Sequence, residues 1–121
     1  DEERLEGFVE DVTGPVTLAR VARARSRWVD LERQPLELSA GGRSLLYRAG
    51  EDDALAERAR RSLAPLLGAE LHALTRSIVV DGDTATVTLR ATVPGRGLGR
   101  VAWRLRRHGD AWRVARVAVR R

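Results

Sequence analysis

The stretch IVVDGDTATVTLRATV, residues 78–93, decides the fold class of this chain. Apolar and polar residues alternate on both sides of the Asp-Gly pair at 81–82, and this pattern predicts two strands joined by a tight turn. The apolar residues lie at even positions before the pair and at odd positions after it. Two facing residues must therefore have numbers whose sum is odd. A two-residue turn at 81–82, which pairs Val80 with Asp83, satisfies this condition.

The same logic applies to the arginine-rich end of the chain, RRHGDAWRVARVAVRR, residues 106–121. A two-residue turn at 109–110 pairs Leu105 with Val114, so that both apolar side chains face the same side of the sheet. After Val114 the apolar residues change from even to odd positions, which predicts a β-bulge near 115–116. The arginines between these apolar positions are then expected to form the solvated outer face of a hairpin.

Three helices and another hairpin are predicted upstream of this region. Apolar spacing of three and four residues predicts helices over 2–12, 15–27 and 50–67, and Gly41-Gly42 lies at the centre of an alternating segment over 35–49. The whole chain, 1–121, is therefore predicted to be a single α+β domain. We expect three helices on the concave side of a strongly bent antiparallel sheet of about six strands, in the order α-α-β-β-α-β-β-β-β.

This order, with the stretches VDGDTATV and GDAWRV at its two turns, resembles the nuclear-transport-factor-two-like superfamily. That cone-shaped, cystatin-like fold is also found in ketosteroid isomerases, scytalone dehydratases and polyketide cyclases. The resemblance covers nearly the whole chain and implies a sheet bent around a pocket at its open end. Many members are dimers, many are enzymes on small apolar substrates, and others are non-catalytic accessory domains. The fold alone therefore does not select a function.

Composition limits the possible functions. The formal net charge is +5, there is no cysteine or methionine, and every basic residue is arginine. Because residues with A/T-rich codons are scarce throughout, coding bias explains much of the arginine content. No apolar run approaches the roughly 20 residues that span a bilayer. Residue 1 is Asp, so we expect that an upstream tag, linker or signal peptide has been removed, and the cellular compartment stays open.

Catalysis inside such a cone needs a polar group, usually a carboxylate, in an apolar pocket. The inward positions between 85 and 119 carry only Ala, Val, Leu and Trp. The resemblance to ketosteroid isomerases also implies a tyrosine on the first helix, where this chain has Phe8. Two distant histidines without cysteine offer no metal-ligand set, and the PGRGLG segment at 94–99 lacks the lysine and the helix of a phosphate-binding loop. We therefore predict neither a metal nor a cofactor.

His72 and Arg76 are the polar exceptions, because a regular strand would turn both inward. One interpretation is an edge strand with a bulge, from which both side chains reach water. The other is a polar end of the pocket that holds a carboxylate or phosphate. Tyr47, Trp28 and Asp30 also have two interpretations, as pocket residues or as ordinary core and turn residues, whereas His108 is predicted to be a solvated loop residue.

The leading hypothesis is a non-catalytic domain that binds a small apolar or amphipathic molecule, with any anionic end at Arg76, or that acts as an accessory or interaction module. The alternative is an isomerase, dehydratase or cyclase that uses His72 with Tyr47 or Asp30. A third, weaker interpretation is a non-specific anion or nucleic-acid binder, and the domain is expected to be a monomer or homodimer. The predicted pocket residues are Val87, Leu89, Val101, Trp103, Leu105 and Trp112 in the floor, with Trp28, Tyr47, His72 and Arg76 nearer the mouth.

Overall fold

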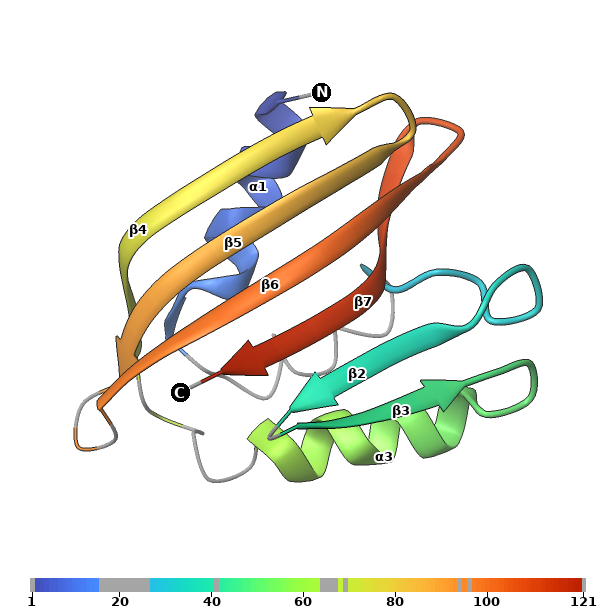
Figure 1. The fold of residues 1–121 in the computed structure, drawn as a ribbon, viewed down its shortest axis with the longest axis horizontal. Coiled ribbons are helices and arrows are strands. Elements are labelled where there is room, and N and C mark those ends of the chain that lie inside the picture. Colours follow the sequence, from blue (N-terminus) through green and yellow to red (C-terminus); the bar gives the residue numbers. More distant parts are fainter. Residues whose placement is uncertain are drawn as a thin grey trace.

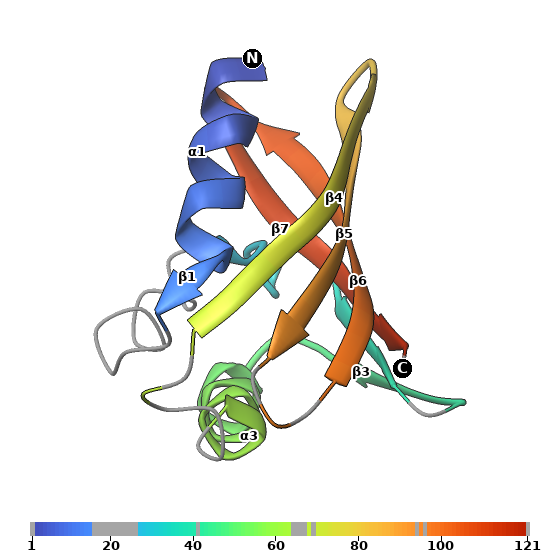
Figure 2. The ribbon, with the colours of Figure 1, turned by 90° about the vertical axis from the view of Figure 1, so that its left-hand side faces the viewer.

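A computed structural model describes residues 2–15, 27–40, 42–63, 68, 70–93, 95 and 97–120. The elements follow the order α1 (Glu2–Val12), β1 (Gly14–Pro15), β2 (Leu36–Ala40), β3 (Arg43–Tyr47), α3 (Asp52–Leu63), β4 (Glu70–Asp81), β5 (Thr84–Val93), β6 (Gly97–His108) and β7 (Ala111–Arg120). The strands form one sheet in the order β1-β4-β5-β6-β7-β2-β3. Figures 1 and 2 show that this sheet is strongly twisted and curved, with α1 against one of its faces.

The predicted fold class needs correction. The prediction of three helices and a fully antiparallel sheet is wrong, because the described residues form two helices, α1 and α3, and a mixed sheet in which β2 runs parallel to β7. Pro15, the expected first residue of a second helix, lies in β1 and pairs with Glu70. The rest of that predicted helix, 16–26, lies outside the described residues. Alternation along a strand reports which face a residue occupies, but it does not report which strand becomes its neighbour.

Both described helices follow simple local rules. The apolar stripe of α1 places Leu5, Phe8 and Val9 in the core with exposed fractions of 0%, 2% and 3%. Thr13 follows the last residue of this helix, and both its backbone N–H and its hydroxyl donate to the carbonyl of Val9. In α3, acidic residues occupy the first turn and arginines the last, as the helix dipole favours, and Leu55 is buried.

Tight turns set the register of the meander β4–β7. The turn at 109–110 and the pairing of Leu105 with Val114 are confirmed, as is the bulge, which leaves Ala115 without a partner between Val114 and Arg116. The predicted turn at 81–82 is displaced by one residue, because Asp81 pairs with Thr84. The loop therefore begins with Gly82, whose φ is +60°, as glycine is required at the first position of a type II′ turn.

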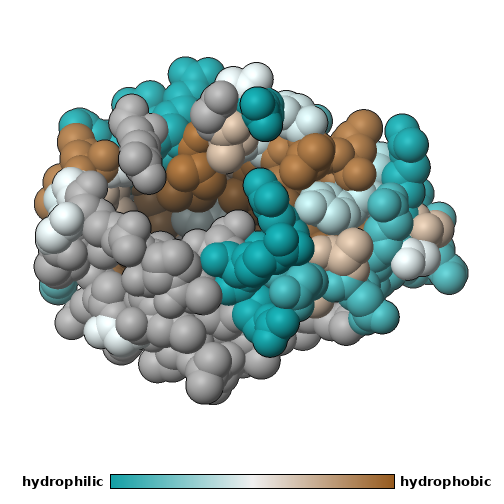
Figure 3. All heavy atoms as spheres, turned by 90° about the horizontal axis from the view of Figure 1, so that it is seen from below, coloured by the Kyte–Doolittle hydropathy of each residue, from teal (hydrophilic) through white to brown (hydrophobic). Residues whose placement is uncertain are grey.

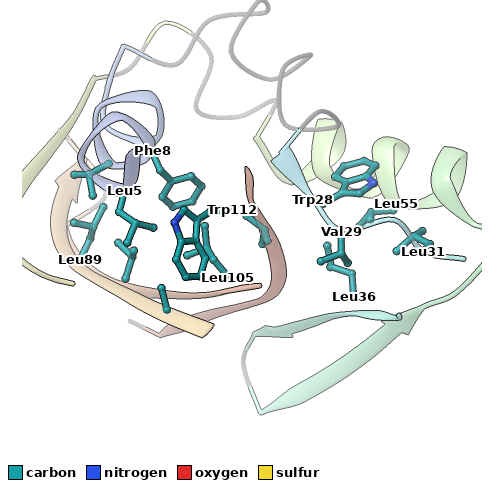
Figure 4. Packing of buried hydrophobic residues seen from close by; sticks show 14 residues of the cluster. Leu5, Phe8, Trp28, Val29, Leu31, Leu36, Leu55, Leu89, Leu105 and Trp112 are labelled. Atoms are coloured by element: carbon teal, nitrogen blue, oxygen red, sulfur yellow. The ribbon is translucent and has the colours of Figure 1, made fainter. Parts of the chain in front are cut away.

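The core lies between α1 and the sheet and continues beneath the sheet beside α3. Figure 4 shows Leu5, Phe8, Leu89, Leu105 and Trp112 in one part, and Trp28, Val29, Leu31, Leu36 and Leu55 in the other. The second part is joined to the sheet by the backbone N–H of Val29, which donates to the carbonyl of Val114 at 2.8 Å. This arrangement fills the part of the cone beneath α1.

Candidate functional site

The inner face of the sheet consists of cross-strand rows that the register defines. The rows run from β4 through β5, β6 and β7 to β2 and β3, so their residues come from distant parts of the chain. The first row is Ile78, Val87, Trp103, Val117, Leu38 and Leu45, and the second is Arg76, Leu89, Val101, Val119, Ala40 and Arg43. Every member of these rows except the two arginines is apolar.

Helix α1 covers one end of these rows. Val87 and Leu105 are fully buried, Leu89 is 2% exposed and Trp112 is 6% exposed. Phe8 contacts the ring of Trp103 edge to face, with the ring centroids 5.5 Å apart. The register thus places Val87, Leu89 and Leu105 on the inner face, as the parity predicts, but these three side chains and Trp112 form core rather than the open floor of a pocket.

The other end of the rows remains accessible. Val101, Trp103 and Val117 are half-buried, while Val119 is 41% exposed and Leu45 is 44% exposed. We call these five residues, together with Leu38, the inner apolar surface. Seen from below, the molecule is hollowed, and hydrophobic side chains are visible within the hollow (Figure 3). A surface of this composition can bury an aliphatic or flat aromatic group.

A bulge in β4 separates His72 from Arg76. The pairs Ala73–Ala91 and Thr75–Arg90 leave Leu74 without a partner, so residues before and after Leu74 have opposite facing. His72 pairs with Thr92 and is exposed on the outer face. Arg76 lies on the inner side of the edge, where its guanidinium is 2.5 Å from the carboxylate of Glu6 on α1. The chain itself therefore supplies an anion to Arg76.

Tyr47 and Trp28 lie in the part of the core near α3 rather than beside His72. Tyr47 pairs with Leu36 and is half-buried, and Trp28 is 8% exposed. Asp30 is exposed, and its carboxylate accepts a hydrogen bond from the backbone N–H of Glu32 at 3.0 Å. His72, which the enzymatic alternative combines with Tyr47 or Asp30, thus lies on the outer face of β4, whereas Tyr47 packs against the core.

The structure also contains a polar hollow that the sequence does not predict. It has a volume of about 320 Å³ and lies beside the β6–β7 turn. His108, which the sequence predicts as solvated, is half-buried there. No periodic pattern signals this hollow, because the loop that bears Asp30 reaches the β6–β7 turn only through the pairing of residues 28–29 with β7. The lining residues are Trp28, Val29, Asp30, Arg33, His108 and Arg113.

Two other structural findings concern the described residues alone. No group of three or more His, Cys, Asp or Glu side chains in the described ranges is arranged to hold a metal ion. Neither α1 nor α3 is long and apolar enough to cross a membrane.

Comparison with known proteins identifies the fold. No protein-family model matches the sequence, and no curated protein sequence matches it. Among solved structures, a protein of unknown function with a cystatin-like fold from Nostoc punctiforme superimposes with a TM-score of 0.73 at 13% identity, over 98% of this chain and 89% of that one. An NTF2-like protein from Novosphingobium aromaticivorans gives 0.57 at 23% identity, over 97% and 80%. This chain has the NTF2-like, cystatin-like fold.

A third neighbour with this fold, a candidate ketosteroid isomerase from Shewanella frigidimarina, gives a TM-score of 0.64 at 15% identity over 85% of this chain and 83% of that one. At these low identities, the superpositions establish the fold and not the activity. In this chain the inner positions of β5, β6 and β7 that the structure describes carry no carboxylate, and Phe8 packs on Trp103 as part of the core. The described inner positions of these three strands therefore offer no carboxylate base.

Proposed function

We propose that this NTF2-like domain binds a small apolar or amphipathic molecule on its inner apolar surface without a chemical step. The observation that carries the proposal is the exposure of Val119 and Leu45 in two inner-face rows of which Val87 and Leu89 are buried members. Apolar side chains at this position gain about 25 cal/mol for each Å² that a ligand covers. The neighbouring inner positions of β5–β7 supply no acid or base to move a proton.

The structure does not favour an anionic end on the ligand over a neutral one. The sequence alone favours an anionic end at Arg76, but Glu6 already forms an ion pair with this arginine. An anionic ligand would have to compete with the Glu6 carboxylate, which lies on the same molecule and is always present. We therefore expect an alcohol and a carboxylate of equal chain length to bind with similar affinity.

The test is a titration with straight-chain alcohols and carboxylates of increasing length. Displacement of an environment-sensitive fluorescent probe reports the binding. Each added CH₂ that becomes buried contributes about 0.8 kcal/mol, so the affinity should rise about fourfold for each CH₂ until the surface is covered. Val119→Asp should weaken binding at least tenfold. Val79→Asp is the matched control, because Val79 is a valine on the outer face that is 59% exposed.

Further results distinguish this proposal from the alternatives. Glu6→Gln should release Arg76 and strengthen the binding of carboxylates without affecting alcohols. The absence of binding across the whole series, or equal weakening by Val119→Asp and Val79→Asp, would contradict the proposal and leave the interaction-module hypothesis. Turnover of a small apolar substrate that His72→Ala abolishes would instead support the enzymatic alternative.

A further inference from the structure

The outer face of the sheet contains a row of three arginines on three neighbouring strands. Arg90 on β5 pairs with Arg100 on β6, which pairs in turn with Arg120 on β7. All three side chains are exposed. Because adjacent strands are about 4.8 Å apart, the row places the three arginine Cα atoms within a span of about 10 Å.

This row is unfavourable for the folded chain alone. Like charges directly opposite each other on neighbouring strands repel and destabilise a sheet. Some other arginines have acidic partners: Arg116 has its guanidinium 3.0 Å from Glu37, and Arg61 is 3.6 Å from Glu57. Within the described part of the chain, no carboxylate forms an ion pair with any of the three arginines in the row. The row therefore concentrates positive charge at one place.

The row also borders a hollow. A depression of about 380 Å³ is lined by Arg90, Leu98, Gly99, Arg100 and Arg120, and none of these residues carries negative charge. The volume lies within the range of small-molecule sites, which begins at about 300 Å³. Leu98 is 46% exposed beside the arginines. The depression thus combines a cationic wall with one accessible apolar side chain.

We propose that this row binds the phosphate group of a small phosphorylated molecule. Guanidinium groups donate paired N–H bonds to phosphate oxygens, and these charge-assisted bonds are about twice as strong as neutral ones. A group with two negative charges offsets the mutual repulsion of the three arginines, which a singly charged carboxylate does less completely. Leu98 then contacts the carbon part of the same molecule. This site lies on the face opposite the inner apolar surface and is independent of the proposed function.

Isothermal titration calorimetry with pyrophosphate, in about 150 mM KCl to screen non-specific attraction, tests the proposal. We expect saturable binding with one site for each chain. Arg100→Gln should weaken it at least about tenfold, because it removes a charge-assisted hydrogen-bond donor from the middle of the row. Arg58→Gln, which removes an exposed arginine from α3, is the matched control and should leave the affinity unchanged.

Other sources of phosphate give different results. Vesicles that contain phosphatidic acid, and a short DNA duplex, should bind weakly at this salt concentration, because their attraction rests on counterion release. The proposal is overturned if pyrophosphate shows no saturation, if Arg58→Gln weakens binding as much as Arg100→Gln, or if only vesicles or duplex bind through Arg100. Val119→Asp should not affect pyrophosphate binding, so failure here is distinguishable from failure of the alkyl-chain titration.

Discussion

The two faces of strands β5, β6 and β7 have opposite characters although their residues alternate along the same chain. On the inner face, Val87 and Leu105 are fully buried. On the outer face, Thr86 and Arg104 pair across the same two strands and are both exposed. One step along the backbone therefore separates the most buried side chains of the protein from some of its most solvated ones.

Because of this difference, the residues that stabilise the fold are not the residues that are free to bind an anion. The inner face is held by apolar packing, which weakens by about 1 kcal/mol when one buried methylene is lost. The outer face contributes little packing, so its residue types are constrained mainly by charge and solubility. An anion-binding row can therefore form there without disturbing the core. Substitutions on the two faces should accordingly change the free energy of unfolding by different amounts, with different signs and with different dependence on salt.

The largest expected difference is between Leu105 and its neighbour Arg106. Leu105→Ala should lower the free energy of unfolding by about 2–5 kcal/mol, because it leaves a cavity at a fully buried position. Arg106→Ala, on the exposed face, should change it by less than about 0.5 kcal/mol. Urea denaturation of both variants measures the two values. Similar losses from the two variants would show that the faces are not energetically separate.

The turns keep the two faces in register, and Gly109 tests this role. Its φ of +60° is unfavourable for any residue with a Cβ, so Gly109→Ala should cost about 1–2 kcal/mol. Gly7→Ala is the control, because a Cβ at Gly7 in α1 meets nothing within 4 Å and its φ is not positive. That variant should gain up to about 1 kcal/mol in a thermal or urea melt. A loss at Gly7 as large as the one at Gly109 would contradict this explanation.

Loss of the Arg116–Glu37 ion pair should lower the free energy of unfolding by a smaller amount, because this pair joins β7 to β2 on the half-exposed outer side. Glu37→Gln removes the charge of a carboxylate whose side chain is 34% exposed, and we expect a loss of about 0.2–1 kcal/mol that decreases at high salt. Urea melts in about 0.05 and 1 M NaCl measure the decrease. A loss that does not depend on salt would indicate packing rather than charge.

The smallest expected effect has the opposite sign. Arg100→Thr should raise the free energy of unfolding by a few tenths of a kcal/mol, because it interrupts the repulsive row and places a β-branched residue in a strand. The gain should shrink in about 1 M NaCl, where the charges are screened. Added pyrophosphate should reverse the order and favour the protein with Arg100. Destabilisation by Arg100→Thr in the absence of anion would show that the row is not strained.

The sequence was sufficient where one local rule determines the structure. The turn at 109–110 follows from the change of apolar parity between Leu105 and Val114, and the bulge at Ala115 follows from a second change after Val114. The turn near Gly82 was misplaced by one residue because parity permits both registers, and the sign of φ selects the one with glycine first. Resemblance to the NTF2-like fold was confirmed by the solved structures that superimpose on the chain.

Contacts between distant segments could not be predicted in this way. Nothing in the local pattern indicates that β2 lies parallel to β7, or that Arg76 reaches Glu6 on α1. The parity of Arg90 and Arg100 predicts their common face, but their alignment with Arg120 depends on the exact register and the bulge in β7. The burial of inner-face residues also depends on α1: Leu89 lies in the part of the core that contains Leu5 and Phe8 and is 2% exposed, whereas Val119 is 41% exposed.

The parallel pairing of β2 with β7 has a consequence for synthesis of the chain. Leu38 finds its partner Val117 only after all of the chain between them has left the ribosome. Until then the edge of β2 that pairs with β7 is open, and Leu38 has no partner on that side. Contacts of such high sequence separation also slow folding. The β2–β3 hairpin therefore joins the rest of the sheet only when β7 has emerged. Interrupted synthesis before β7 should yield an aggregation-prone intermediate.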